Sequence, residues 1–254
     1  MESRYIMNTP NIYAVIIGSE ILNGRRVDKH FNFLQSALAT RGYTLFCVEI
    51  IKDDEALIKS SFERVKADEN SMLFCFGGIG STPDDLTRAV AAEIFTSEPL
   101  VRHEQFEKDI ITRFGEGAFP NRIHMSDLPA GSSLLKNPVN NMSGFYLEER
   151  YFFTPGFPEM AHAMVEEAIE RFLPQNRPLY RKTVLARCSE ERLISIMKRM
   201  PNEIECSSLP MFVNEKANVE MSVASYDEKM TLKYFAMFVD FLEANNIDYE
   251  VKVL

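Results

Sequence analysis

From residue 12 to residue 96 the sequence alternates short apolar runs with segments whose apolar residues recur three or four positions apart. Residues 12–17 form a continuous apolar run, as expected of a strand buried on both faces of a parallel sheet, and residues 45–51 and 72–76 read as further strands. Residues 28–40 and 54–65 show helical spacing. This alternation constrains the fold more than any other feature of the chain, because successive strand–helix units build a doubly wound, mostly parallel α/β sheet.

The rest of the first two-thirds is less regular. A helix is expected from residue 103 to residue 114, and many Gly, Pro, Asn and Ser residues between 115 and 143 predict loops. Residues 144–147 and 151–154 read as a hairpin. Pro158 then opens a further helix, since proline is well accommodated at a first helical position.

A domain boundary is predicted at residues 173–178, which contain two prolines and few apolar residues. It separates a large domain of residues 1–173 from a small domain of residues 179–254. The order of elements in the small domain is strand, helix, strand, strand, helix, strand, which predicts a ferredoxin-like α+β fold. No catalytic constellation is evident there, and this favours a role in stability or dimerisation.

The composition excludes several classes of protein. The formal net charge is −9, whereas a general nucleic-acid binder needs a basic face, so no nucleic-acid partner is expected. No apolar run approaches membrane-spanning length and no signal peptide is recognisable, so no membrane partner is expected. The four cysteines stand far apart, which is typical of a reducing compartment. These features predict a cytoplasmic protein.

The strongest local signal is the run GGIGSTPDDLT at residues 77–87, between an expected strand and an expected helix. Glycines allow a ligand to approach the backbone, and the free N–H groups at a helix start attract phosphate. In an open α/β sheet, ligands bind at the carboxyl ends of the strands. The candidate ligand-binding residues in this run are Gly77, Gly78, Gly80, Ser81, Thr82 and Asp84.

The acidic residues of this run have a second interpretation. Thr82 would be the N-cap of the helix, Pro83 its first residue and Asp85 the capping-box partner. Asp84 is then equally consistent with a favourable position in the helix dipole and with a ligand contact. Both interpretations stay open at the level of sequence.

Three carboxylates are expected at the same edge of the sheet. Glu20 follows the first strand, Asp53 follows the second, and Asp85 closes the glycine-rich run. Carboxylates on one rim can share a divalent cation with ligand phosphates, so Glu20, Asp53 and Asp85 are the candidate catalytic and metal-binding residues. The alternatives are a solvated glutamate in a surface loop and an aspartate that only caps a helix.

A further candidate segment is TPGFPEM at residues 154–160, where an expected strand ends in a turn and a helix begins. Such a turn can accept a phosphate or a ribose hydroxyl, which makes Gly156 and Glu159 candidate ligand-binding residues. Glu159 is equally explained as a favourable charge at a helix N-terminus.

Three of these segments, GSEILNG at residues 18–24, GGIGSTPDDLT at 77–87 and PGFPEM at 155–160, resemble the signature stretches of the competence/damage-inducible protein A (CinA) N-terminal domain. The resemblance spans residues 11–172 and implies the molybdopterin-binding fold of the MogA and MoaB type. It also implies a homodimer and metal-dependent hydrolysis of ADP-ribose or related dinucleotides. Family members often carry a C-terminal nicotinamide-nucleotide amidohydrolase domain, which we expect to be absent here because the chain ends at Leu254.

The resemblance also suggests individual roles. Asp85 resembles the aspartate that closes the glycine loop in the molybdopterin proteins, Asp53 the acid after their second strand, and Glu20 the acid of the first loop. The sequence departs from the family at three places. Ser19 replaces an aspartate, Lys29-His30 replaces Thr-Asn, and Ser81 stands where proline is usual.

The expected function is metal-dependent hydrolysis of a nucleotide pyrophosphate such as ADP-ribose, with Mg, Mn or Co as the divalent metal. Phosphate oxygens would lie against the glycine-rich run, and the metal would stabilise charge that develops on them. Two alternatives stay open: nucleotidyl transfer to molybdopterin in the same pocket, and a nucleotide- or pterin-binding protein without turnover.

Overall fold

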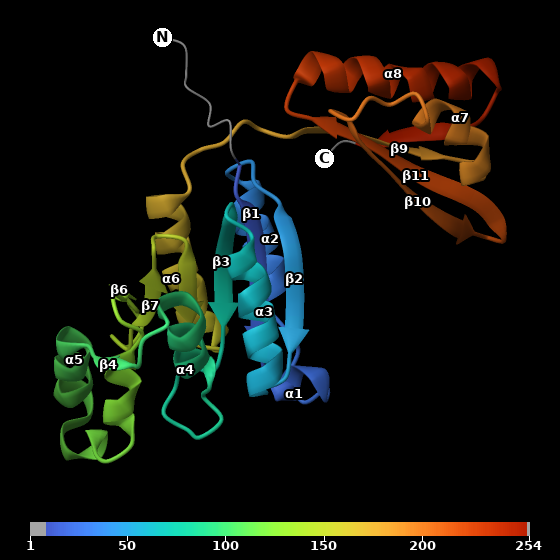
Figure 1. Ribbon diagram of the computed structural model, residues 1–254. Coiled ribbons are helices and arrows are strands. Elements are labelled where there is room, and N and C mark those ends of the chain that lie inside the picture. Colours follow the sequence, from blue (N-terminus) through green and yellow to red (C-terminus); the bar gives the residue numbers. More distant parts are fainter. Residues whose placement is uncertain (1–8, 253–254) are drawn as a thin grey trace, which may run out of the picture. The chain divides into compact units, whose positions relative to one another are not determined.

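The computed structural model describes residues 9–252 (Figure 1). The chain divides into two compact units, Met1–Asn176 and Arg177–Leu254.

The first unit is built on a six-stranded sheet with the strand order β2-β1-β3-β8-β7-β6. Four neighbouring strands are parallel: β2 (Leu45–Ile51), β1 (Asn11–Ile17), β3 (Ser71–Phe76) and β8 (Tyr151–Thr154). The next strand, β7 (Gly144–Leu147), pairs antiparallel with β8 on one side and with β6 (Ser133–Leu135) on the other. This order confirms the predicted mostly parallel α/β fold.

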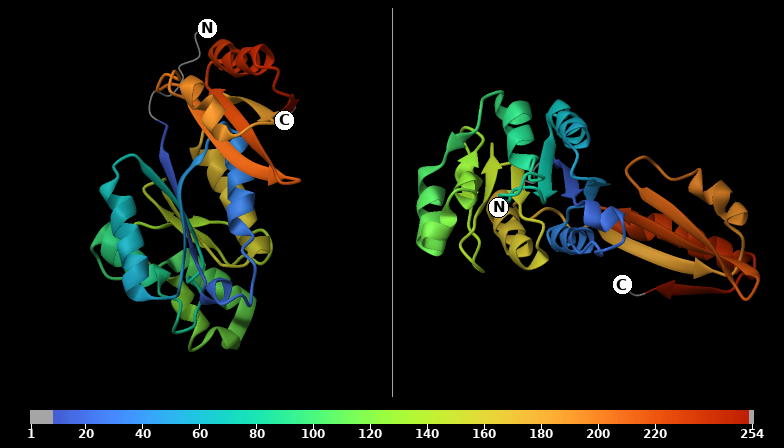
Figure 2. Two further views of the ribbon diagram at one scale, coloured as in Figure 1. Left: turned by 90° about the vertical axis from the view of Figure 1, so that its right-hand side faces the viewer. Right: turned by 90° about the horizontal axis from the view of Figure 1, so that it is seen from below.

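Helices cover both faces of this sheet (Figure 2). One apolar core joins the sheet to α3 (Glu55–Ala67) and α4 (Thr87–Ala91), which continues as a π-helix (Ala92–Thr96). The other core joins it to α2 (His30–Ala39) and α6 (Pro158–Phe172). As predicted, β1 is almost entirely buried, and so is β3, because both faces of these strands are covered.

Residues 101–128 form an excursion from the sheet. Only part of this excursion was predicted from the sequence. Its helix α5 (Glu104–Phe114) was predicted. Two short strands were not: β4 (Val101–Arg102) pairs antiparallel with β5 (Asp127–Leu128). Between them lie two 3-10 turns, Gly115–Ala118 and Arg122–Ser126.

The second unit has the predicted βαββαβ order. Its four strands, β9 (Tyr180–Ala186), β10 (Glu205–Val213), β11 (Lys216–Ser225) and β12 (Tyr249–Lys252), form an antiparallel sheet in the order β10-β11-β9-β12. The second helix, α8 (Glu228–Ala244), is long, but the first is a 3-10 turn (Glu190–Leu193) followed by the one-turn α7 (Ile194–Met197). The main differences from expectation are this shorter first helix and the extension of β10 to Val213.

Across residues 9–252, no helix has the length and apolar character needed to cross a membrane.

Candidate functional site

The carboxyl ends of β1, β2, β3 and β8 lie at one edge of the sheet because these strands are parallel. We call this edge the rim. Backbone hydrogen bonds tie its loops together: Gly18 N–H donates to Ile51 O (3.0 Å), and Gly77 N–H donates to Thr154 O (2.9 Å). The rim therefore places the segments after all four strands at one edge, where the sequence predicted that the three after β1, β2 and β3 would converge.

Residues 77–81, called here the glycine loop, require glycine at their first two positions. Gly77 has φ +100° and Gly78 has φ +69°, values that favour glycine. A Cβ on Gly77 would lie 2.4 Å from Ile17 O, and one on Gly78 would lie 2.3 Å from the Thr87 hydroxyl oxygen. That hydroxyl donates to Gly77 O (2.9 Å). The glycines thus let the loop pack against the end of β1.

The helix after the glycine loop begins later than the N-cap interpretation predicted. That interpretation placed its start at Pro83, but α4 begins at Thr87, whose N–H already donates to Gly78 O (3.0 Å). Asp85 instead closes a turn: its Oδ2 accepts from the Thr82 N–H (2.8 Å) and hydroxyl (2.7 Å). Asp84 is exposed on this turn. The donors next to a ligand in this region would therefore be backbone N–H groups of the glycine loop and not those of a helix N-terminus.

Arg88 fixes the end of the glycine loop from behind. It is only 8% exposed, and its Nη2 donates to Gly80 O (2.7 Å) while Nη1 donates to His124 O. Burial lowers the pKa of its guanidinium, an effect that Asp85 and Asp127 oppose. Arg88 thereby joins the glycine loop to the excursion of residues 101–128.

A cavity of about 210 Å³ opens beside the loop, between it, the excursion and the turn after β8. Its described lining residues are Ile79, Gly80, Ser81, Phe106, Phe114, Arg122, Met125, Asn140, Met142, Ser143, Pro155, Phe157 and Met160. Most are apolar or aromatic. Among them Arg122 is the one charged residue, and no carboxylate is present. In a chain of net charge −9, this lining favours a ligand with an apolar or aromatic part and a negative charge.

Glu20 and Asp53 lie at the neighbouring ends of β1 and β2, where both have protein partners. The Asp53 carboxylate accepts from Ser19 N–H (2.7 Å), and the Ser19 hydroxyl accepts from Asp53 N–H (3.2 Å). Glu20, in the short helix α1 (Ser19–Leu22), forms an ion pair with Arg26 (3.7 Å). These contacts hold the two loops against each other.

Gly156 lies next to the glycine loop: a Cβ on it would be 3.5 Å from Gly77 Cα. Its carbonyl oxygen is 3.3 Å from His30 Nε2, and since a carbonyl only accepts, Nε2 carries the proton. His30 is 3% exposed, and burial lowers its pKa to about 4. Its Nδ1 has no partner among the described residues. Glu159 is exposed in the first turn of α6 and does not line the cavity.

The three predicted metal ligands do not form one cluster. Within residues 9–252, no three His, Cys, Asp or Glu side chains are grouped so that they could hold a metal ion. Asp53 and Asp85 each accept through Oδ2 and keep Oδ1 outside the hydrogen bonds of the described residues, but only Asp85 lies against Gly80 of the glycine loop. Because Mg²⁺ commonly takes one or two carboxylates together with substrate phosphates, this donor set fits a cation shared between Asp85 and a ligand.

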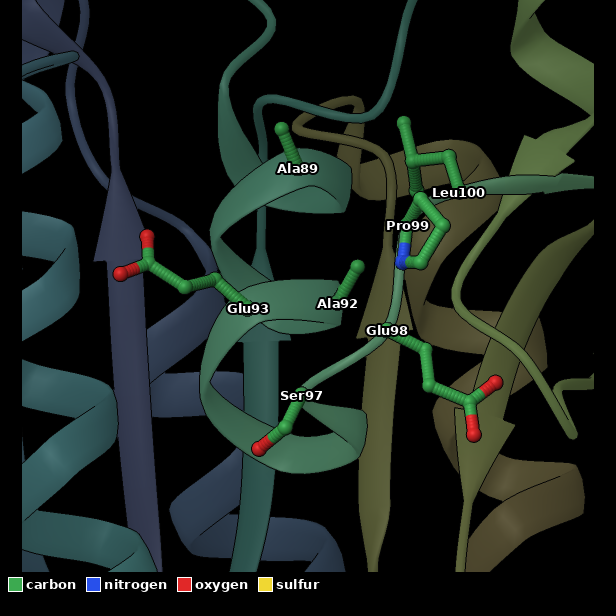
Figure 3. Close-up of a pocket in the computed structure, with 7 residues that line it drawn as sticks. All are labelled: Ala89, Ala92, Glu93, Ser97, Glu98, Pro99 and Leu100. Carbon is green, nitrogen blue, oxygen red and sulfur yellow. The ribbon is translucent and has the colours of Figure 1, made fainter.

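A larger hollow of about 470 Å³ lies between α4, the π-helix and residues 97–100. Its described lining is mostly small or apolar, and its two carboxylates, Glu93 and Glu98, extend in opposite directions (Figure 3). Glu93 is also paired with Lys59. Since no polar groups converge there, the cavity beside the glycine loop is the better candidate site.

The fold and rim define an α/β ligand-binding domain, and comparison with known proteins gives its family. Residues 13–175 match the family described as "Probable molybdopterin binding domain", and the chain belongs to that family. It is 30% identical over 167 residues to a CinA-like protein of Acaryochloris marina, covering 63% of this chain and 39% of that protein.

A putative competence-damage inducible protein of Bacillus pumilus is 23% identical over 251 residues, covering 94% of this chain and 58% of that protein. The chain thus spans between 39% and 58% of the length of these two relatives. The crystal structure of a protein CinA of unknown function from Thermoplasma acidophilum superimposes with a TM-score of 0.57 at 26% identity, covering 65% of this chain and 98% of that one.

Two cationic residues of the site were not predicted from the sequence. Arg88 lies one residue past the glycine-rich run, on the helix face that is otherwise apolar, and a charge on such a face was the available signal. Arg122 lies in a loop segment about forty residues downstream, and no local pattern connects it with the glycine loop.

Proposed function

We propose that the cavity beside the glycine loop binds a phosphorylated nucleotide or pterin, and that the protein hydrolyses a nucleotide pyrophosphate such as ADP-ribose in a metal-dependent reaction. The observation that carries the proposal is the lining of the cavity. It combines a glycine loop, one cation and no carboxylate in an otherwise acidic chain. Phosphate oxygens would lie against the loop N–H groups and the Arg122 guanidinium.

Part of the ligand beyond its phosphates would contact the apolar remainder of the cavity, and the rest would extend past its edge. Phe106, Phe114 and the methionines of the lining supply aromatic and polarisable contacts. Arg88 would keep the loop in place through Gly80 O, so that its N–H groups are already oriented when phosphate arrives. Such preorganisation is the main way in which fixed dipoles stabilise developing charge.

Hydrolysis requires a water molecule to attack one phosphorus atom and break the bridging P–O bond. ADP-ribose would give AMP and ribose 5-phosphate, with the bridging oxygen leaving on one phosphate. Asp85 does not line the cavity itself, but its carboxylate lies against Gly80, which does, and its Oδ1 accepts no hydrogen bond from the described residues. We assign Asp85 to orient this water and accept its proton. A divalent cation, when bound by Asp85 and the phosphates, would neutralise charge on the phosphate oxygens. Glu20 and Asp53 would support the neighbouring loops.

The test is AMP release from ADP-ribose with Mg²⁺, Mn²⁺ or Co²⁺, comparing wild type with Asp85→Asn. We expect metal-dependent turnover that falls by about 100-fold or more in the variant, the usual size of a general-base effect. Glu98→Gln is the control, because Glu98 is exposed at the other hollow. Turnover that is unchanged in Asp85→Asn would contradict the role of Asp85. Binding of ADP-ribose without turnover in the wild type would indicate a binding protein instead.

A second candidate is adenylyl transfer to molybdopterin in the same cavity, as its aromatic and methionine-rich lining also suits a pterin ring. It predicts an adenylylated pterin product without net pyrophosphate hydrolysis. The homodimer suggested by the family resemblance stays a prediction, which sedimentation of the purified chain would test.

A further inference from the structure

Phe157 is a large apolar side chain that stability does not explain. It is 55% exposed and stands at the N-cap of α6, where it makes no side-chain capping hydrogen bond. Ser, Thr, Asp and Asn are the favoured N-cap residues. By contrast, Asp54 and Asp227 cap α3 and α8 with their side chains. Single exposed apolar side chains are common on protein surfaces, so what distinguishes Phe157 is that it stands at an N-cap without capping the helix and also lines the cavity.

The ring stands on a fixed piece of backbone at the edge of the cavity, which it helps to line. On one side, Gly156 O accepts from the buried His30. On the other, Pro158 is buried as the first residue of α6. A ligand that contacts Phe157 would not have to order this segment, and a smaller ordering cost favours binding.

Arg26 lies beside the ring. Its guanidinium carbon is 5.4 Å from the Phe157 ring centroid, within the range of a cation–π contact. Arg26 is in turn paired with Glu20 (3.7 Å). The resulting chain from Glu20 through Arg26 to Phe157 connects the loop after β1 with the turn after β8, and it gives Glu20 a function that needs no metal.

The size of the cavity indicates where a ring would lie. Its volume of about 210 Å³ is below the roughly 300–1,000 Å³ typical of pockets that enclose a drug-sized ligand. A dinucleotide therefore extends beyond the cavity. With its phosphates at the glycine loop, its ring reaches the edge, where Phe157 offers an exposed aromatic face and Arg26 a planar cation.

We propose that Phe157, with Arg26 beside it, is the stacking platform for the planar heteroaromatic ring of the ligand, an adenine or a pterin. This inference rests on the proposed function, because the ligand's phosphates are placed by the glycine loop. An aromatic face can stack with any flat ring. Phe157 would therefore favour ligands that carry a ring and would not favour phosphate compounds that lack one.

The first test measures dissociation constants by calorimetry for wild type and Phe157→Leu. The ligands are ADP-ribose, 6-hydroxymethylpterin diphosphate and inorganic pyrophosphate, which has no ring. We expect Phe157→Leu to raise the dissociation constant of at least one ring-bearing ligand by about 5- to 150-fold, the range that base stacking gives. The dissociation constant of pyrophosphate should not change. The ligand that is weakened identifies the ring. Phe46→Leu is the matched control, because Phe46 is 62% exposed and lies near the start of β2, at the opposite end of the strand from the rim.

The second test uses the absence of tryptophan from the chain. Phe157→Trp keeps an aromatic face and introduces the sole indole. We expect this variant to retain the affinity of the wild type and its fluorescence to change when the ring-bearing ligand, but not pyrophosphate, is added. Phe46→Trp should show no such change.

The outcomes separate this inference from the proposed function. Equal affinities of wild type and Phe157→Leu for both ring-bearing ligands, or an equal loss for pyrophosphate, would overturn the stacking platform while leaving phosphate binding intact. If the wild type binds none of the three ligands, the proposed site and the platform both fail. Urea unfolding of Phe157→Leu verifies that the variant is folded.

Discussion

Arg88 Nη2 lies 2.7 Å from Gly80 O and donates a hydrogen bond to it, so that a buried cation on α4 holds the far end of the glycine loop. The same guanidinium reaches His124 O on the opposite side. Two walls of the candidate site therefore depend on one side chain.

Replacing Arg88 by Met should lower the free energy of unfolding by about 2–4 kcal/mol, because it removes the hydrogen bonds to Gly80 O and His124 O and leaves these carbonyls without this donor. Urea unfolding measures the change. Lys108→Met, at an exposed position on α5, should be within about 0.5 kcal/mol of wild type. A similarly small effect at Arg88 would contradict its role as the link between the two walls.

Gly77→Ala should disrupt the rim. The new Cβ would lie 2.4 Å from Ile17 O at φ +100°, and we expect a loss of roughly 3 kcal/mol or more. Gly24→Ala isolates the contribution of the backbone angle, since Gly24 has φ +77° but nothing within 4 Å of the added methyl; it should cost about 1 kcal/mol. Thermal or urea unfolding compares the two. Equal losses would mean that the contact with Ile17 has no energetic weight.

His30 should make the protein less stable in acid. Its pKa falls from an ordinary 6.5 to about 4 in the folded state, so between these values the unfolded chain binds a proton that the folded chain excludes. The stability that comes from keeping His30 neutral is fully present above pH 6.5 and is lost as the pH falls towards 4. It amounts to roughly 3 kcal/mol.

The measurement is the free energy of unfolding of wild type and His30→Phe from pH 7 to pH 4. Groups common to both proteins cancel in the difference, so the wild type should lose roughly 3 kcal/mol more than the variant. Parallel pH profiles would show that His30 is not a buried neutral imidazole.

Arg122→Gln should raise the dissociation constant for inorganic pyrophosphate by about 10-fold or more, since hydrogen bonds to charged groups contribute about 1.5–3 kcal/mol. Calorimetry at two salt concentrations should also show a smaller salt dependence than in wild type. As a control, Arg171→Gln also removes one positive charge, but at the C-terminal end of α6. It should leave the affinity for pyrophosphate unchanged. If both variants bind equally well, Arg122 does not contact phosphate.

The parts of the fold that local pattern determines were predictable. Strands such as Leu45–Ile51 and the Asp54 cap of α3 follow from apolar runs and capping chemistry within a few residues. The order βαββαβ of the second unit was read in the same way. The short strands β4 and β5, each two residues long, carry too little pattern to be recognised.

The candidate site was less predictable because its contacts join residues far apart in the chain. The glycine loop was found from its composition, but its partner Arg122 comes from a turn in the excursion. Asp85 was expected to pair with Thr82 at a helix start or to bind metal. The pairing with Thr82 is present, but it closes a turn ahead of α4. The sequence shows that Glu20, Asp53 and Asp85 follow strands of one rim. It does not show which hydrogen-bond or ion-pair partner each carboxylate has.

The order β2-β1-β3 means that the chain reverses its winding between β1 and β3, and in open α/β sheets the crevice at such a reversal usually receives the ligand. Here Gly77 lies so close to the end of β1 that an added Cβ would be 2.4 Å from Ile17 O. The accessible opening is displaced by one strand, to the gap between the loops after β3 and β8. In consequence the carboxylates of Glu20 and Asp53, at the reversal, are engaged in holding neighbouring loops together, while the open space of the rim lies one strand away.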